Sequence, residues 1–122
     1  PRWDPELPEA LERYFIRKDQ TPPILTDVGL DSKIFSVDKD MISKCKNSGV
    51  TFVSLIKELC EGEKCKTLIG PNWHKDIVTA DNGHFTSTAS LYLAERTLGP
   101  TILKMLGKAV PAKASTETSA NR

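Results

Sequence analysis

One short segment, residues 50–55, places the strongest constraint on the fold, because no other part of the chain has so clearly the composition of a buried strand. The run Val50-Thr51-Phe52-Val53-Ser54-Leu55 is β-branched and aromatic and lies between a glycine and a helical segment, which is typical of a parallel strand. A single strand cannot satisfy its own backbone hydrogen bonds. We therefore expect partner strands from residues outside this chain or from a second copy, so that the 122 residues form part of an α/β domain with an incomplete sheet.

Helical patterns precede this segment. The prolines and acidic residues of Asp4-Pro5-Glu6-Leu7-Pro8 favour a helix start, and the apolar spacing after them predicts about three turns that end near Lys18. Residues 20–32 contain prolines and a glycine and are predicted to form a loop. A second helix is expected to end at Asn47-Ser48-Gly49, with caps and apolar residues at Ser36, Asp38, Asp40, Met41, Ile42 and Cys45.

A long amphipathic helix is predicted near the end of the chain, over residues 87–106. Pro100 interrupts it, so the helix is either kinked or divided at Leu98-Gly99. Its apolar stripe from Leu91 to Leu106 is expected to pack on the sheet. Before it we expect a short helix over residues 57–60 and extended pieces over 66–70 and 76–79. Residues 1–106 are assigned to the domain, and 107–122, which are small and polar, to a flexible tail.

The charge balance excludes some classes of partner. With 17 Lys and Arg residues against 16 Asp and Glu residues, the net charge is 17 − 16 = +1. Such a chain has no general attraction to a phosphate backbone, so nucleic acid is not an expected partner. No apolar run approaches the roughly 18 residues that a membrane span needs, and the first residues do not resemble a signal peptide. We expect no membrane-spanning segment in these residues.

The cysteines bear on the cellular compartment. A polar turn with a central glycine separates Cys60 from Cys65, which allows a local disulfide and so favours an oxidising compartment, either the periplasm or a secretory lumen. Two reduced cytosolic thiols are the alternative. Cys45 is predicted to be a small buried hydrophobe. The three cysteines with His74 and His84 lack the spacing of a zinc site, so we expect no metal and no other cofactor.

The segment most informative about chemistry is Asp81-Asn82-Gly83-His84, just before the long helix. Gly83 allows a turn in which the Asp81 carboxylate reaches the His84 imidazole. A carboxylate that fixes one imidazole nitrogen leaves the other free to take a proton from a serine hydroxyl. Thr86 or Ser87 is expected to cap the following helix. The alternative interpretation is a capped turn whose histidine has no catalytic role.

The order of several motifs resembles the C-terminal half of an SGNH-type hydrolase domain. These motifs are Pro1-Arg2-Trp3-Asp4, the Phe52-Val53 strand, the Cys60 and Cys65 pair, and Asp81-Asn82-Gly83-His84-Phe85-Thr86. More narrowly, the chain is similar to the domains attached to membrane acyltransferases that O-acetylate cell-surface sugars. The resemblance implies a three-layer, flavodoxin-like fold with a parallel sheet. It also implies that Asp81 orients the imidazole and that His84 is the general base.

The chain departs from the family where the nucleophile should be. The family's serine, which follows a glycine and an aspartate, and its glycine and asparagine oxyanion donors lie in blocks that this chain lacks. Ser32 has a leucine within the similar letters Gly29-Leu30-Asp31-Ser32 and is a poor candidate, and Asn72 is better explained as a turn residue. Ala89 replaces a common family glycine, which is a mild change. We expect the serine to lie outside this chain, and the chain alone to be inactive.

Two hypotheses follow. In the first, the chain supplies the base, through Asp81 and His84, to a serine esterase or O-acyltransferase that acts on O-acylated cell-surface carbohydrate. In the second, it is a non-catalytic extracytoplasmic module for binding or tethering. Trp3 and Trp73 could stack on sugars, but tryptophans beside prolines more often serve packing. The expected partners are the carbohydrate, the N-terminal part of the same domain or a second copy, and a membrane acyltransferase domain.

Overall fold

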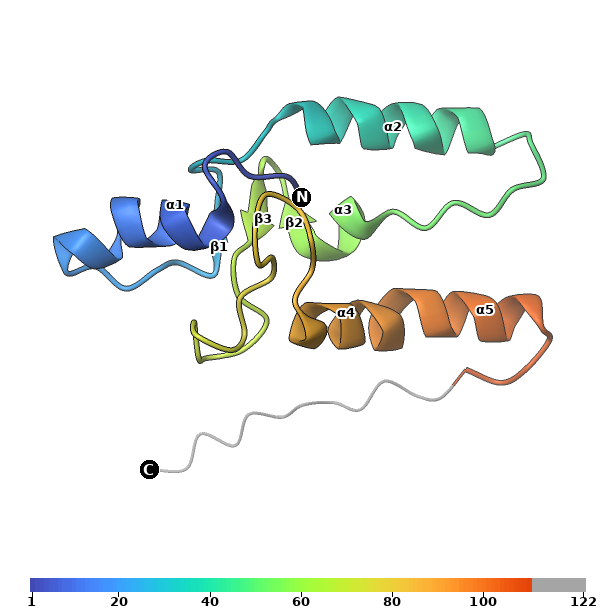
Figure 1. Ribbon diagram of the computed structural model, residues 1–122. Helices are drawn as coiled ribbons and strands as arrows, with labels where there is room; N and C mark the ends of the chain where they lie inside the picture. The colour runs from blue at the N-terminus through green and yellow to red at the C-terminus, as the bar shows by residue number, and fades with distance from the viewer. Residues whose placement is uncertain (111–122) are drawn as a thin grey trace.

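The computed structural model describes residues 1–110, which form an α/β structure of helices around a small antiparallel sheet (Figure 1). Residues 111–122 of the predicted tail lie outside this description. No helix in the described part combines the length and the apolar character that crossing a bilayer requires. The elements are α1 (Leu7–Tyr14), η1 (Ile16–Lys18), β1 (Leu25–Thr26), α2 (Lys33–Cys45), α3 (Leu55–Leu59), β2 (Cys60–Glu61), β3 (Lys64–Lys66), α4 (Ser87–Leu93), η2 (Ala94–Leu98) and α5 (Gly99–Met105).

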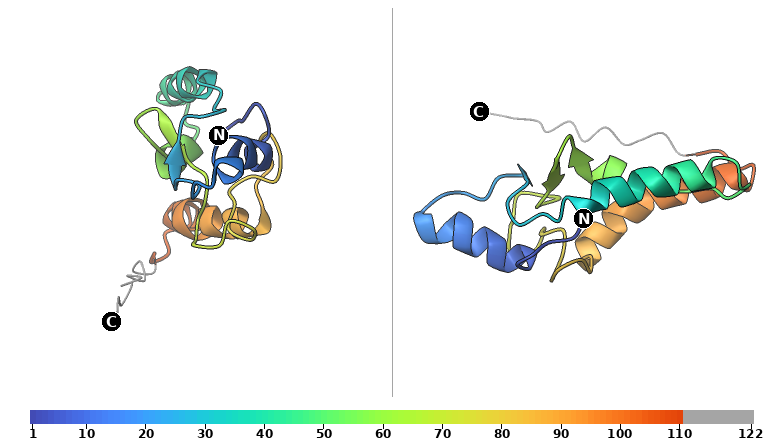
Figure 2. Two further views of the ribbon diagram at one scale, coloured as in Figure 1. Left: turned by 90° about the vertical axis from the view of Figure 1, so that its left-hand side faces the viewer. Right: turned by 90° about the horizontal axis from the view of Figure 1, so that it is seen from above.

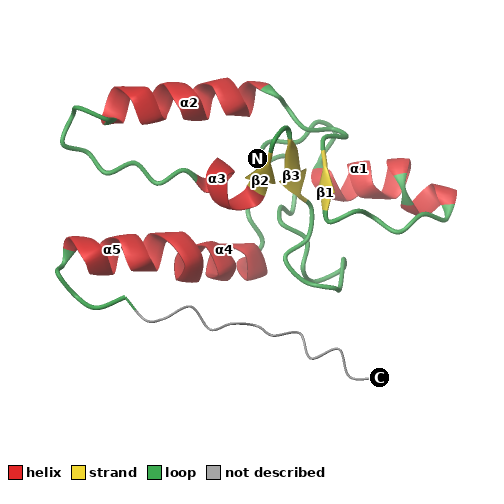
Figure 3. Ribbon diagram, turned by 180° about the vertical axis from the view of Figure 1, so that it is seen from behind, coloured by secondary structure: helices red, strands yellow, loops and turns green. Residues whose placement is uncertain are grey.

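The sheet has three very short strands in the order β1-β3-β2, and both pairs are antiparallel. Cys60 and Cys65 face each other across the β2–β3 hairpin and form a disulfide, which confirms the predicted local pairing. Figure 3 shows the strands from behind, gathered near the inner ends of the helices. Among residues 1–110 no two strands pair in parallel, so the parallel sheet of the predicted three-layer fold is not found there.

Residues 50–55 do not form the predicted strand within the described part of the chain. Residues 51–54 run as an irregular connection, and Leu55 already belongs to α3, where the Ser54 side chain accepts a hydrogen bond from the backbone N–H of Lys57 at 3.1 Å. The backbone N–H groups of residues 51–54 donate no hydrogen bond to any described residue. The β-branched composition is present, but a strand also needs a neighbour to pair with, and the described residues provide none.

The hydrophobic core lies between α1, the small sheet, the N-terminal segment and α4. Trp3, Leu7, Leu11, Leu59 and Val78 are completely buried in it. Trp3 therefore serves packing, as predicted, and Trp73 packs partly against the same cluster. The extended pieces over residues 66–70 and 76–79 meet at an isolated bridge between Leu68 and Ile77.

α2 and α5 project from this core on the same side, and residues 46–54 return between them (Figures 1 and 2). No residue of α2 or α5 is buried. The apolar stripe predicted to pack on a sheet is instead exposed beyond Leu93, because the described chain provides no sheet for it to cover. Ile102 is 55% exposed and Leu106 is 63% exposed. Cys45, predicted to be buried, is only half-buried at the end of α2.

The predicted long helix forms, and a π-helical turn adapts it to Pro100. In η2 the backbone N–H of Gly99 donates to the carbonyl of Ala94, five residues back. This wider turn accommodates a proline that has no N–H to contribute. A Cβ on Gly99 would lie 2.8 Å from the Ala94 oxygen, so glycine suits the position. Gly107 adopts a positive φ of 65° and ends α5, with Lys108 N–H donating to the carbonyl of Leu103 at 2.9 Å.

Candidate active site

The turn that carries Asp81 and His84 is closed at its base by backbone pairing. Thr79 and Phe85 form an antiparallel bridge, and the N–H of Ala80 donates to the carbonyl of His84 at 2.9 Å. Thr86 then caps α4, as predicted, because its side-chain oxygen accepts from the N–H of Ala89 at 3.2 Å. Its hydroxyl also donates to the carbonyl of Ile77 at 2.7 Å. The turn is therefore joined directly to the start of a helix.

The structure brings Asp81 and His84 into contact. One carboxylate oxygen, Oδ1, accepts from the backbone N–H groups of Gly83 at 2.9 Å and His84 at 2.8 Å. The other, Oδ2, lies 2.7 Å from His84 Nδ1. These hydrogen bonds, from the Gly83 backbone first, then the His84 backbone and the imidazole, lower the pKa of Asp81 to about 2. The carboxylate is therefore ionised throughout the neutral range.

The geometry fixes which imidazole nitrogen is available for chemistry. An ionised carboxylate can only accept a hydrogen bond, so the Nδ1 atom facing Asp81 carries a proton. Nε2 is the opposite nitrogen, and no described residue hydrogen-bonds to it. The His84 side chain is 91% exposed, whereas that of Asp81 is 37% exposed. In the neutral imidazole, Nε2 therefore offers its lone pair to an approaching group.

The N-terminal segment supports the turn from beside it. The N–H of Trp3 donates to the Asn82 carbonyl at 2.7 Å, and the Asn82 side-chain amide donates to the Trp3 carbonyl at 2.7 Å. Because the Trp3 side chain is buried in the core, the position of Asn82 is tied to that core. The neighbouring Asp81 and His84 are held by the same attachment.

A second group of side chains fixes α4 to the rest of the molecule. The Tyr92 hydroxyl donates to Glu58 at 2.9 Å, Arg96 donates to the same carboxylate at 2.6 Å, and Lys66 donates to Tyr92 at 3.0 Å. Partial burial raises the pKa of Glu58, but the bonds from Tyr92 and Arg96 outweigh it and leave this pKa below its ordinary value. These residues are far apart in sequence, and no local pattern could have identified the cluster.

The described residues do not complete a catalytic triad. Among residues 1–110 no serine hydroxyl hydrogen-bonds to His84. Ser32 is exposed at the start of α2. Asn72 belongs to a turn, as predicted, with its side-chain oxygen accepting from the N–H of His74 at 3.0 Å. No cluster of three or more His, Cys, Asp or Glu residues that could hold a metal ion occurs in the same part of the chain.

A shallow cavity of about 490 Å³ adjoins the turn, and we call it the polar cup. Its lining comprises Arg2, Asp4, Gly29, Leu30, Asp31 and Asn82. These residues belong to three motifs of the sequence, Pro1-Arg2-Trp3-Asp4, Gly29-Leu30-Asp31-Ser32 and Asp81-Asn82-Gly83-His84, but no sequence pattern predicted that they line one cavity. Side-chain alternation in an extended segment could have indicated part of this lining. If Trp3 is buried, the side chains of Arg2 and Asp4 point to the opposite face.

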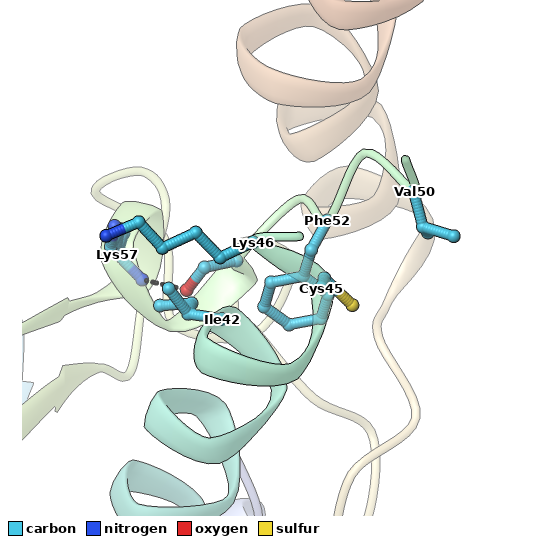
Figure 4. Close-up of a pocket in the computed structure, with 7 residues that line it drawn as sticks. Ile42, Cys45, Lys46, Val50, Phe52 and Lys57 are labelled. Atoms are coloured by element: carbon cyan, nitrogen blue, oxygen red, sulfur yellow. Dashed lines mark hydrogen bonds between the residues drawn. The ribbon is translucent and has the colours of Figure 1, made fainter. Parts of the chain in front are cut away.

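A second cavity, of about 310 Å³, lies where α2 meets the returning segment (Figure 4). Ile42, Cys45, Val50 and Phe52 contribute apolar side chains, while Lys46 and Lys57 lie at its rim. It is on the projecting side of the molecule, and its lining includes none of the residues of the Asp81–His84 turn.

Comparison with solved structures finds a similar protein. The chain resembles the periplasmic domain of the lipopolysaccharide acetyltransferase of Salmonella ser. Paratyphi A, with 29% sequence identity and a TM-score of 0.77. The similarity covers 84% of this chain and 39% of that domain, so the chain spans well under half the length of the protein it matches. No protein-family model matches the chain, and no curated protein is close enough to count as a relative. The chain thus shares its fold with part of an acyltransferase periplasmic domain.

Proposed function

We propose that this chain supplies the catalytic base to an SGNH-type serine esterase or O-acyltransferase domain, of which it forms the C-terminal half. The substrate would be O-acylated carbohydrate at the cell surface. The observation that carries the proposal is the 2.7 Å contact between Asp81 Oδ2 and His84 Nδ1, together with the 91% exposure of the His84 side chain. This arrangement orients a base toward solvent, where a nucleophile and a substrate have access to it.

In the proposed reaction, Nε2 of His84 takes the proton of a serine hydroxyl while the serine oxygen attacks the ester carbonyl. Asp81 stays ionised and stabilises the imidazolium that forms. As the tetrahedral intermediate collapses, the C–O bond to the leaving hydroxyl breaks, and the imidazolium returns the proton to that oxygen. Water, or a sugar hydroxyl in a transfer reaction, then attacks the acyl-serine by the same proton path.

The location and substrate class are supported by two independent observations. The neighbour is a periplasmic domain of a lipopolysaccharide acetyltransferase, and the Cys60–Cys65 disulfide of this chain is of a kind that persists in oxidising compartments. We infer an extracytoplasmic protein, attached to a membrane acyltransferase domain, that acts on carbohydrate esters.

The nucleophile would come from the N-terminal part of the same domain. Residues 51–54 donate no backbone hydrogen bond to any described residue, and they lie between two helices that contain no fully buried residue. The neighbouring domain has 100 − 39 = 61% of its length beyond the matched region, which is enough for a single polypeptide to fill such a space. Strands seated there would pair with residues 51–54, cover the apolar stripe of α5 and complete a three-layer parallel sheet.

The non-catalytic alternative has one observation in its favour. Asp81 Oδ1 already accepts two backbone hydrogen bonds inside the turn, so the turn would persist without a contribution from the imidazole. In that case the chain would be an extracytoplasmic module for binding or tethering, and His84 an incidental exposed residue.

Replacing the two residues in the longer protein that includes the serine separates these functions. His84→Ala should abolish hydrolysis of 4-nitrophenyl acetate, and Asp81→Asn should lower kcat by on the order of 10⁴. His74→Ala is the matched control, since His74 is exposed and lies outside the turn. Activity close to that of the parent in both turn variants, with the fold intact by circular dichroism, would leave only the binding or tethering function.

The position of the missing part is tested on α5. In the longer protein Ile102→Asp should prevent stable folding, because it would place a charge under the proposed strands. Lys104→Asp, on the same helix, is the control and should fold normally. If the longer protein folds stably with Ile102→Asp, the proposed strands do not cover α5. A stable symmetric dimer of the 122-residue chain in light scattering would assign the surface to a second copy instead.

A further inference from the structure

We propose that the polar cup beside the Asp81–His84 turn binds an uncharged sugar residue of the substrate. The inference rests on the proposed function, because it concerns how a carbohydrate ester would be held near His84. The cup has about 490 Å³ of space, within the range of small-molecule sites.

The backbone builds the cup from three segments that lie side by side. Residues 2–4 pair with residues 29–31, with Asp4 N–H donating to the Gly29 carbonyl at 2.7 Å and Asp31 N–H to the Arg2 carbonyl at 2.9 Å. Asn82 joins the other edge through its bonds to Trp3. Since Trp3 points into the core, its neighbours Arg2 and Asp4 lie on the opposite face. The floor of the cup is thereby anchored to the most buried tryptophan.

The backbone must approach closely at Gly29. Its φ is +76°, and a Cβ there would lie 3.3 Å from the Cβ of Ala10 and 3.6 Å from the Asp4 carbonyl oxygen. A glycine lets the two segments pair at this distance, which holds the backbone of residues 2–4 at the cavity.

The side chains in the cup have hydrogen-bonding groups to spare. Neither the Arg2 guanidinium nor the Asp4 carboxylate has a hydrogen-bond or ion-pair partner among residues 1–110. Asp31 uses one oxygen, which accepts from the Lys33 N–H at 3.0 Å. Asn82 uses its amide nitrogen and leaves its oxygen open. Carboxylates that accept and a guanidinium that donates suit a molecule with several adjacent hydroxyl groups.

The charges of the cup select among hydroxyl-rich ligands. Two carboxylates and one guanidinium leave a net negative charge, which disfavours phosphate groups and uronic acids. The mostly polar lining also disfavours an acyl chain. A neutral hexose or deoxyhexose remains as the class that fits.

The cup is also close enough to the base to matter for catalysis. Asn82 and His84 are two residues apart in one turn, so their Cα atoms are at most about 7 Å apart. A sugar that contacts Asn82 would thus present its neighbouring ester, or an adjacent hydroxyl, within reach of the exposed imidazole. Binding in the cup would set which position of the polysaccharide is acylated or deacylated.

The test uses the longer protein in a His84→Ala background, so that binding is measured without turnover. The probe is the de-O-acetylated surface polysaccharide of the organism that encodes the chain, titrated by calorimetry. Asp4→Asn should weaken binding by about tenfold, the loss of a charge-assisted hydrogen bond. Asp40→Asn, on the exposed side of α2, is the matched control and should bind within twofold of the background protein.

Equal affinity in Asp4→Asn and the background protein would overturn the proposal, as would no binding of the polysaccharide at millimolar sugar. Polygalacturonate fragments should bind at least tenfold more weakly than the neutral polymer, and equal binding would contradict the assigned sugar class. Full hydrolysis of 4-nitrophenyl acetate by His84→Ala would instead reject the proposed base and leave the cup as a carbohydrate site.

Discussion

Two regions of this molecule differ in how completely they satisfy their own interactions. Around the Asp81–His84 turn, the buried Trp3, Leu59 and Val78 pack together, a disulfide closes the hairpin, and each segment is tied to another by backbone bonds. We call this the turn region. The projecting region comprises α2, residues 46–54 and α5. Neither helix has a buried residue, and the N–H groups of residues 51–54 donate no hydrogen bond within residues 1–110.

The difference separates interactions that residues 1–110 complete among themselves from interactions that they leave open. Asp81 and His84 belong to the turn region and need nothing further for their mutual geometry. The apolar face of α5 belongs to the other class, because residues 1–110 provide no contacts that bury it. Substitutions in the turn region should therefore change the stability of the chain more than substitutions in the projecting region.

The largest contrast is expected from one substitution made in both regions. Leu59→Ala removes a fully buried side chain and should lower the free energy of unfolding by about 2–5 kcal/mol. Leu106→Ala, at a position 63% exposed, should change it by less than about 0.5 kcal/mol. Urea denaturation of the 122-residue chain measures both. A similar loss of unfolding free energy at the two positions would contradict the difference between the two regions.

The disulfide is the next largest contributor. Replacing both Cys60 and Cys65 with serine should cost about 2 kcal/mol, since the bond closes only a short loop. Denaturation with and without reducing agent provides the same comparison for the parent chain. Cys45→Ser is the control, because this thiol is half-buried and outside the disulfide. An equal loss of stability in that variant would show that the loss does not come from the disulfide.

A smaller effect is expected at the cap of α4. Thr86→Ala removes the acceptor for the Ala89 N–H and the donor to the Ile77 carbonyl, and should cost about 1 kcal/mol. Ser87→Ala, one residue later and exposed, should cost little. Thermal unfolding of the two variants compares them, and equal midpoints would show that the cap does not anchor the turn.

The smallest expected effect concerns pH. The pKa of Asp81 is lowered to about 2, so the turn's ionised contacts are fully present above the ordinary value near 3.8 and are lost as pH falls through about 2. Carbon NMR of the carboxyl group should show this midpoint. In His84→Ala the midpoint should rise yet stay below 3.8, because the Gly83 and residue-84 backbone bonds remain. An unshifted midpoint in the parent would exclude the hydrogen-bonded turn.

Local sequence signals predicted the turn region well. The glycine within Asp81-Asn82-Gly83-His84, the cap at Thr86 and the Cys60–Cys65 spacing all act over a few residues, and each produced the contact that its chemistry favours. The identity of the nucleophile and the catalytic role of His84 stay predictions, since they depend on residues beyond these contacts.

Signals that depend on distant partners were less informative. Residues 50–55 have strand-like side chains, yet pairing requires a neighbouring strand, which residues 1–110 do not provide. The polar cup and the Glu58–Tyr92–Arg96 cluster also escaped prediction, because their members meet only after folding. A periodic apolar stripe on α5 indicated a buried face but could not say which polypeptide would bury it.

The π-helical turn at Ala94–Leu98 connects α4, which packs on the core, with α5, which belongs to the projecting region. An inserted residue rotates everything after it by about 100° around the helix axis. Ala89 and Leu93 can thus contact the core while the next apolar residues point in another direction. Deleting one residue from this turn would restore a regular α-helix and rotate α5 about the helix axis by roughly 100° relative to α4. The residues before the turn and those after it could then no longer both keep the directions that they have now.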